Sequence, residues 1–249
     1  MTARSRVPIL LSEVCVAYAP SIMGRRALFD MLGGKQVSPF VALNRVSLAI
    51  EAGSSIAVIG QNGAGKSTLL KVAAGILPPS RGDVTIHGSV GTLLDLGAGL
   101  EGALDGWKNI ELAAALQRFC TKRTLKFRDY VADFSGLGPA LSRPVRTYSA
   151  GMTLRLLFSL RTFVEPDILV IDEVFGAGDH AFTKKANARM RELLNCASTV
   201  IFASHDHHLL QELCTQAVWL DHGTIVAQGA VADVIGRYLD AQSAPAGNG

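Results

Sequence analysis

The stretch Gly60-Gln61-Asn62-Gly63-Ala64-Gly65-Lys66-Ser67 decides the fold of this chain. It follows Ser55–Ile59, a short run rich in apolar and β-branched residues, and precedes a helix-like segment. A strand, a glycine-rich loop and a helix in this order, with the spacing GxxxxGK[ST], predict a phosphate-binding loop. A glycine-rich turn before a structural helix is the alternative, but Lys66 and Ser67 would add nothing to packing in such a turn.

Each part of the loop has a chemical task. The glycines let successive backbone N–H groups surround phosphates, and the helix N-terminus adds partial positive charge at the same point. Lys66 is expected to reach the β- and γ-phosphates of a nucleotide, and Ser67 to ligate Mg²⁺.

A second functional pattern is the apolar run Ile168–Ile171, which ends in the adjacent acids Asp172 and Glu173. Two neighbouring carboxylates repel each other without a cation, so we expect Mg²⁺ beside Asp172. Glu173 would then polarise the attacking water as a general base. The alternative is a strand that ends in ordinary solvated acids.

The remaining chain indicates one α/β domain. Val41–Ile50 alternates as a strand does, and Val200–Ala203 is a further apolar strand that ends in Ser204-His205-Asp206. Polar residues thus follow the C-terminal ends of three strands, Ser55–Ile59, Ile168–Ile171 and Val200–Ala203. Open α/β sheets place their ligands at such strand ends. Helical periodicity predicts an inserted helical subdomain over about 94–163, and a hairpin and a short helix follow the last parallel strand. The expected elements there are the helices Asn109–Phe119, Thr124–Phe134 and Ala150–Phe163, the hairpin Ala217–Ala227 and the helix Val231–Leu239.

Length and composition set further bounds. The 249 residues, 49% of them hydrophobic, suit a single domain over 1–249, with a disordered tail at about 243–249. A net charge of +3 from scattered cations, with no interleaved aromatic residues, argues against nucleic acid as a partner. The apolar runs are too short to span a bilayer, and no secretory signal is visible. The four widely spaced cysteines are expected to be reduced core residues.

Tyr148-Ser149-Ala150-Gly151-Met152 resembles the signature motif of the ABC ATPase family and precedes the Asp172-Glu173 strand, as in that family. The resemblance implies a P-loop NTPase (RecA-like) core sheet with an inserted helical subdomain and an antiparallel β subdomain. It implies ATP and Mg²⁺ as cofactors, ATP hydrolysis, and nucleotide contacts along the loop up to Thr68. It also implies a homodimer, in which Ser149 and Gly151 meet the γ-phosphate held by the other subunit. Taken alone, Ser149 before a helix is an N-cap.

Further positions resemble the family. His205 corresponds to its switch histidine, which contacts the γ-phosphate, although a lone histidine is more often structural. Gly178-Asp179 is similar to the D-loop, and Tyr18 stands where an aromatic stacks on adenine, unless it is a core or edge-strand tyrosine. Asp95 stands where most members carry a glutamine that senses Mg²⁺ and the membrane partner, so its role is open.

Asp95 followed by Leu96-Gly97-Ala98-Gly99, the Tyr-Ser-x-Gly-Met signature and the extended segment between Tyr18 and Val41 resemble the polysaccharide-exporting ABC ATPases. The resemblance implies a lipid-linked glycan as substrate, a separate integral-membrane permease docked near Asp95–Leu100 and the inserted helices, and a peripheral location at the cytoplasmic face of the inner membrane. No glycan-binding module fits after the hairpin, so we expect the glycan not to be bound directly. A drug or lipid exporter and a soluble ABC ATPase are the alternatives.

Overall fold

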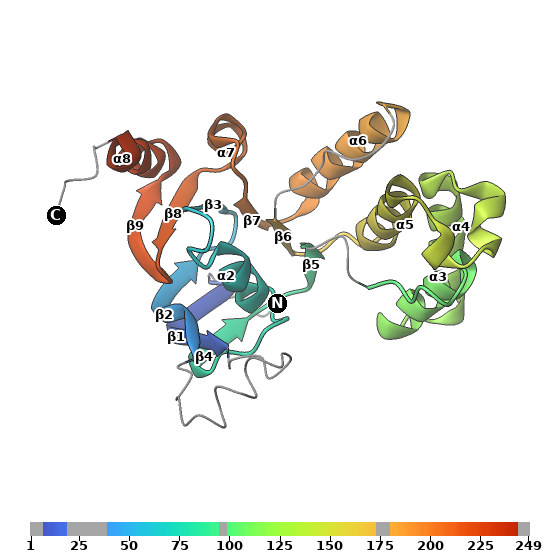
Figure 1. Cartoon of the computed structure of the whole chain (residues 1–249), viewed down its shortest axis with the longest axis horizontal. Coiled ribbons are helices and arrows are strands. Elements are labelled where there is room, and N and C mark those ends of the chain that lie inside the picture. The colour runs from blue at the N-terminus through green and yellow to red at the C-terminus, as the bar shows by residue number, and fades with distance from the viewer. Residues whose placement is uncertain (1–6, 19–38, 95–98, 173–179, 244–249) are drawn as a thin grey trace, which may run out of the picture. The chain divides into compact units, whose positions relative to one another are not determined.

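The structure, a computed structural model, describes residues 7–18, 39–94, 99–172 and 180–243 (Figure 1). The chain divides into two compact units. The sheet unit comprises Met1–Gly88, Val170–Glu173 and Ser198–Gly249, and the helical unit comprises Ser89–Leu169 and Val174–Ala197.

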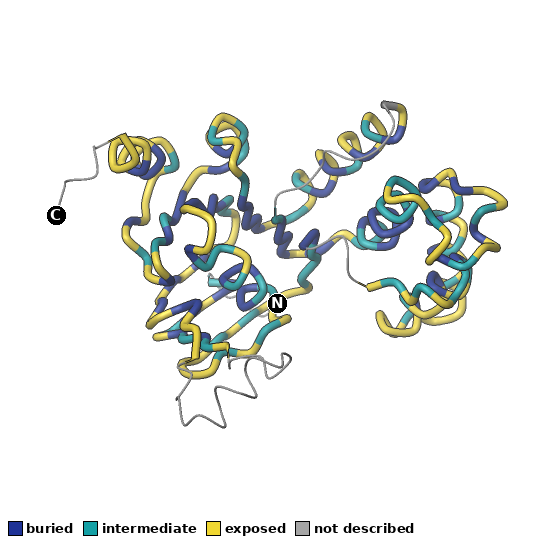
Figure 2. Tube along the Cα trace, viewed as in Figure 1, coloured by how far each residue is buried: buried dark blue, intermediate teal, exposed yellow. Residues whose placement is uncertain are grey.

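The sheet unit is built on a largely parallel sheet. Its central strand β3 (Ser55–Ile59) lies between β7 (Thr199–Ala203) and β8 (Gln216–Asp221), parallel to both. The strand β9 (Thr224–Ala230) pairs antiparallel with β8, and β6 (Ile168–Asp172) lies next to β7, so the order is β6-β7-β3-β8-β9. Strands β3, β6 and β7 are almost continuously buried (Figure 2). Burial on both faces explains why these strands are uniformly apolar.

A second, antiparallel sheet has the order β2-β1-β4, with β2 at Phe40–Ile50, β1 at Ile9–Tyr18 and β4 at Arg81–Ile86. The helix α2 (Lys66–Ala73) packs against all three of these strands and against β7. Its buried face contains Leu69, Leu70 and Val72. Because α2 is fixed on both sheets, the loop that precedes it has a fixed position at the end of β3. The helices α7 (His207–Leu213) and α8 (Val231–Ser243) complete the unit.

The helical unit holds β5 (Val90–Leu93), α3 (Gly106–Leu116), α4 (Thr121–Ser135), α5 (Ala150–Thr162) and α6 (His180–Cys196). Two 3₁₀ helices, η1 (Gly138–Ser142) and η2 (Val145–Thr147), connect α4 to α5. Apolar side chains from α3, α4, α5 and the connection between α4 and α5 form one core. The rings of Phe119 and Phe163 pack against the buried Phe127 ring and against each other, with centroids 5.0–5.8 Å apart. The core comprises Ile110, Ala114, Phe127, Val131, Leu137, Leu141, Val145, Leu156 and Leu160.

The three predicted helices of the insertion are present, with shifted ends. The first begins at Gly106 rather than Asn109, because the Asp105 carboxylate accepts the Lys108 N–H at 2.8 Å and caps the helix. It ends at Leu116, shortly before Arg118 takes a positive φ of 54°. The strands β1, β4 and β5 and the helix α6 had no predicted ranges. The division into a single domain with a helical part at about 94–163 stays a prediction.

Among the residues with assigned positions, no helix is both long and apolar enough to cross a bilayer. The cysteines differ from expectation: Cys214 is buried, but Cys120 and Cys196 are exposed and Cys15 is half-buried. The expectation of core cysteines is therefore wrong for Cys120 and Cys196.

Candidate functional site

A pocket of about 270 Å³ lies in the sheet unit, at the C-terminal ends of its parallel strands. The phosphate-binding loop, the end of β6 and the residues after β7 all contribute to it, as predicted for polar side chains at strand ends. Its lining residues are Phe40, Ala42, Asn62, Gly63, Gly65, Lys66, Ser67, Thr68, Asp172 and His205.

Two glycines of the loop are required by the backbone around them. Gly65 has φ 104°, and a Cβ there would lie 2.5 Å from the Ala42 carbonyl oxygen. Gly60 has φ 150°, and a Cβ there would overlap the Leu220 carbonyl oxygen. Gly63 has φ 82° but faces open space. The loop is therefore pressed against neighbouring strands at both ends, while its middle is open to a ligand.

Lys66 is held by the loop itself. Its ammonium group donates hydrogen bonds to the carbonyl oxygens of Gly60 at 2.7 Å and Gln61 at 3.0 Å. These bonds place the cation across the loop, beside the N-terminus of α2. The N-cap of α2 is Gly65, whose lack of a side chain leaves the first-turn N–H groups without a side-chain cap. A lysine and uncapped N–H groups at one point favour an anionic ligand such as a phosphate.

Ser67 and Asp172 bring a hydroxyl and a carboxylate into the same pocket. Both are hard oxygen donors, which Mg²⁺ prefers, and Mg²⁺ completes its octahedral shell with phosphate oxygens and water rather than a full protein cage. The Ser67 hydroxyl and the Asp172 carboxylate therefore fit Mg²⁺ bound together with a nucleotide. Within the described ranges no cluster of three or more His, Cys, Asp or Glu side chains could hold a metal ion.

His205 lines the pocket, and its neighbours in the sequence fix its position. The Ser204 hydroxyl accepts the Asp206 N–H at 3.1 Å. The Asp206 carboxylate in turn accepts the N–H groups of His208 at 3.0 Å and Leu209 at 3.1 Å, which makes it the N-cap of α7. The turn between β7 and α7 is thus stabilised by the flanking residues, and the exposed His205 lines the same pocket as the phosphate-binding loop.

Two aromatic residues meet at one end of the antiparallel sheet. Tyr18 ends β1 and pairs with Phe40 at the start of β2. The Tyr18 hydroxyl lies 3.4 Å from the Thr68 hydroxyl, but Tyr18 is not among the pocket-lining residues. Phe40 does line the pocket and is 63% exposed. Sequence reasoning missed Phe40, because the predicted strand began one residue later; an apolar aromatic at the start of an alternating strand was the available signal.

Ser149 and Gly151 lie in the helical unit, in an open pocket of about 650 Å³. The Ser149 hydroxyl accepts the Met152 N–H at 3.3 Å, so Ser149 is the N-cap of α5. Arg143 and Arg155 line the same pocket, which sequence reasoning also missed. Arg155 stands four residues after Gly151 on α5, and this spacing places both on one helix face.

Tyr148, the first residue of the segment that resembles the signature motif, is held in place by a hydrogen bond. Its hydroxyl donates a hydrogen bond to the Ala140 carbonyl oxygen at 2.8 Å. Burial, and secondarily the Asp105 carboxylate, raises the pKa of Tyr148 above its ordinary value. The phenol is therefore neutral at physiological pH and keeps its donor proton.

Three of the predicted site residues, Glu173, Asp179 and Asp95, lie outside the described residues. The structure thus brings together the loop residues, Asp172 and His205 in the sheet unit, and Ser149 and Gly151 in the helical unit.

A phosphate-binding loop, a strand-end aspartate and a histidine after the next strand define a P-loop nucleotide hydrolase. The profile of the ABC transporter family matches residues 43–176, and the chain belongs to that family. The chain is accordingly an ATP-binding protein and an ATP hydrolase of the ABC type.

Known proteins resemble this chain over most of its length. The O-antigen export system ATP-binding protein RfbE of Yersinia enterocolitica is 43% identical over 78% of this chain and 82% of its own. The teichoic acids export ATP-binding protein TagH of Bacillus anthracis is 36% identical over 79% of this chain and 36% of its own. The solved dimeric structure of the ATP-binding cassette MJ0796 bound to ADP and Pi covers 90% of this chain with a TM-score of 0.67. At 18% identity, the last shows a shared fold alone.

Proposed function

We propose that this chain is the ATP-hydrolysing subunit of a transporter that exports a lipid-linked polysaccharide through a separate integral-membrane permease. The pocket that joins Lys66, Ser67, Asp172 and His205 carries the ATPase part of the proposal. The export part rests on the relatives, whose names refer to O-antigen and to teichoic acids. Both are glycopolymers, which favours a polysaccharide over a drug or a free lipid as the substrate.

Within the pocket, each side chain has a task in hydrolysis. Lys66 exchanges its two carbonyl partners for the β- and γ-phosphates, and the N–H groups at the start of α2 donate to the same oxygens. Ser67 and Asp172 would hold Mg²⁺, which neutralises charge on the phosphates when bound. His205, which lines the same pocket, would donate a hydrogen bond to the γ-phosphate, and Glu173 is the proposed general base for the attacking water.

The pocket of about 650 Å³ that contains Ser149 and Gly151 supports a homodimer with the nucleotide between two copies. Arg143 and Arg155 make this pocket positive, and the Ser149 hydroxyl keeps its proton to donate, because it only accepts from Met152. A Cβ added at Gly151 would meet no atom within 4 Å, so packing within the chain does not require a glycine there. The space above Gly151 suits a close approach of the γ-phosphate bound to the partner.

A groove in the helical unit is the proposed permease site. We call it the α3 groove; it has a volume of about 340 Å³, and the exposed side chains Leu112 and Leu116 lie on its rim. Gly99, which belongs to the expected docking segment Asp95–Leu100, also lines it. Asn109, 2% exposed, binds the neighbouring backbone through Glu101 N–H at 2.8 Å and the Asp105 carbonyl oxygen at 2.8 Å. A groove with exposed leucine side chains on its rim suits a helix of the permease. The subunit would then be peripheral at the cytoplasmic face of the inner membrane.

Deletion of the gene, followed by fractionation of surface and intracellular glycan, tests the proposal. We expect intracellular lipid-linked polymer to accumulate, and we expect re-expression of the chain, but not of Lys66→Ala, to restore surface glycan. Normal surface glycan in the deletion strain would contradict the export role. Accumulation of a drug or lipid substrate instead would place the chain in another exporter class.

A further inference from the structure

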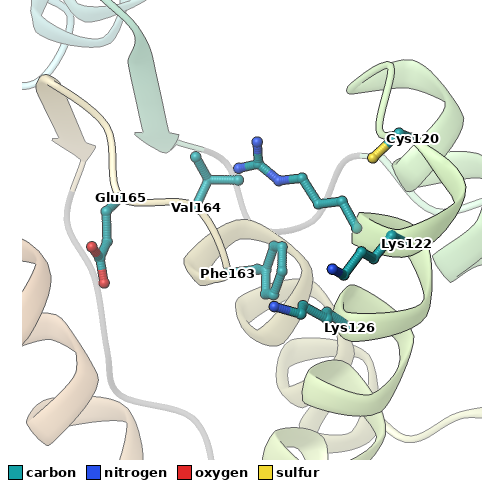
Figure 3. A pocket seen from close by; sticks show the side chains of 7 residues that line it. Cys120, Lys122, Lys126, Phe163, Val164 and Glu165 are labelled. Atoms are coloured by element: carbon teal, nitrogen blue, oxygen red, sulfur yellow. The ribbon is translucent and has the colours of Figure 1, made fainter.

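The helical unit holds a second pocket, of about 600 Å³, between the start of α4 and the chain that leaves α5 (Figure 3). We call it the basic pocket. In Figure 3, Lys122 and Lys126 extend from α4 toward Phe163. Its lining residues are Cys120, Lys122, Arg123, Lys126, Phe163, Val164 and Glu165.

The pocket carries net positive charge. Residues 118–128 contain five Lys or Arg residues and no carboxylate. The one acid of the lining, Glu165, is already paired with Arg189 at 3.4 Å. No ion pair among the described residues involves Lys122, Arg123 or Lys126. Three cations therefore face solvent at one place without a neutralising carboxylate.

The position of these cations on the helix is electrostatically unfavourable. Lys122 and Arg123 lie in the first turn of α4, and no acid lies in that turn. The N-terminus of a helix carries partial positive charge, which stabilises anions and repels cations. The Arg123 guanidinium lies 4.4 Å from the centroid of the Phe119 ring, a favourable cation–π contact, but Lys122 has no such contact among those of the described residues. A bound anion would turn the repulsion between both cations and the helix N-terminus into attraction. Cations in the first turn of a helix are unfavourable for stability, and unfavourable residue choices of this kind are expected at functional positions.

Exposed apolar side chains accompany the cations. Leu125, 57% exposed, stands on α4 between Lys122 and Lys126. The other large apolar side chains that the described part of the helical unit exposes are Leu112 and Leu116, at 41% and 76%. Val164 lines both the basic pocket and the α3 groove, so the two hollows are neighbours. Leucines among lysines and arginines form the pattern of a surface that lies in a membrane interface.

We propose that the start of α4, through Lys122, Arg123, Lys126 and Leu125, binds the phosphate headgroups of anionic lipids at the membrane surface. The cations neutralise the headgroups, and Leu125 enters the adjoining acyl region. This contact needs neither nucleotide nor permease, so it goes beyond the proposed function and would give the subunit a membrane affinity of its own. An acidic protein segment would use the cations but would give no reason for Leu125 to be exposed between them.

Vesicle binding by the full-length chain tests this directly. The probes are vesicles of phosphatidylcholine alone and of phosphatidylcholine with about one quarter phosphatidylglycerol, with co-sedimentation measured at low and high salt. We expect binding to the anionic vesicles only, with loss at high salt. Since each cation near an anionic surface contributes roughly a fivefold gain in partitioning, Lys122→Glu/Arg123→Glu/Lys126→Glu should lower it on the order of 10²-fold.

The matched control is Lys184→Glu/Arg191→Glu/Arg237→Glu, which changes the net charge equally at exposed positions elsewhere. It should retain most of the binding, and Leu125→Ser should weaken it without a charge change. ATP hydrolysis measured on the same samples shows whether each variant is folded, and it separates failure of this proposal from failure of the ATPase assignment.

Four results would overturn the proposal. Two are equal binding by the basic-pocket and control variants, and equal binding to both vesicle types. The third is displacement by inorganic phosphate beyond an ionic-strength-matched chloride control, which would assign the pocket to free phosphate. The fourth is recruitment that appears only when a permease is reconstituted, which would assign the pocket to a protein.

Discussion

Replacement of Lys66 by alanine should weaken ATP binding more than it lowers the stability of the fold. The ammonium group donates hydrogen bonds to the Gly60 and Gln61 carbonyl oxygens at 2.7 and 3.0 Å. Loss of these bonds exposes the two carbonyls to water, and we expect a free energy of unfolding lower by about 1–3 kcal/mol. The larger effect should be on ATP, because the point charge between the β- and γ-phosphates disappears.

The size of the effect follows from ligand linkage. At an ATP concentration of about 100 Kd, binding stabilises the native state by about 2.7 kcal/mol. If Lys66→Ala weakens binding on the order of 10²-fold, the same concentration equals the new Kd and stabilises by only about 0.4 kcal/mol. For a chain of this size the lost increment corresponds to roughly 5–9 °C of Tm.

The assay is thermal unfolding with and without Mg-ATP, together with fluorescent-nucleotide titration. Lys71→Ala is the matched control, since Lys71 lies in the last turn of the same helix. It should keep the ATP-dependent increase in Tm. Unchanged nucleotide affinity in Lys66→Ala would refute the assignment of the phosphate-binding loop, whatever happens to the stability of the nucleotide-free chain.

Four further outcomes are expected. Gly65→Ala should lower the free energy of unfolding in urea titrations by about 2–4 kcal/mol, because the added Cβ would lie 2.5 Å from the Ala42 carbonyl oxygen. Gly63→Ala, whose Cβ would face open space, should lower it by only about 1–2 kcal/mol. Equal losses would contradict the close approach at Gly65. Phe40 lines the pocket and is 63% exposed, so we expect its ring to stack on the adenine base. Phe40→Ala should therefore weaken ATP binding about tenfold but leave tripolyphosphate binding unchanged. A parallel loss of both would remove Phe40 from adenine recognition. Glu173→Gln should slow turnover on the order of 10²–10⁴-fold while the ATP-bound dimer persists in sizing chromatography, and a monomeric or fully active variant would rule out its role as the base. Burial raises the pKa of Cys214 to about 12, so the folded state favours the neutral thiol. The free energy of unfolding should therefore fall as the pH rises from about 9 toward 12. Cys214→Ala should flatten the plot of unfolding free energy against pH over this range.

Local sequence patterns identified the nucleotide loop and the elements around it. The loop is specified by contiguous residues whose conformational and chemical demands are visible one at a time: glycines for positive φ, a lysine for phosphate, a serine for Mg²⁺. The same holds for the strands β3, β6 and β7, whose uniform apolarity predicts burial on both faces. Ser149 shows the limit of this reasoning, because its N-cap geometry fits the structural and the functional interpretation equally well.

The family and the chemistry of this protein were thus determined by its sequence, because a phosphate cradle depends on adjacent residues. Only the tertiary structure decided which distant residues share a surface. The pairing of β1 with β2 set Phe40 rather than Tyr18 into the pocket lining, and α5 placed Arg155 beside Ser149. The basic pocket likewise required the chain after α5 to lie against the start of α4, so that Phe163 and Lys126 adjoin. Such contacts depend on packing between segments far apart in sequence, and no local periodicity encodes them.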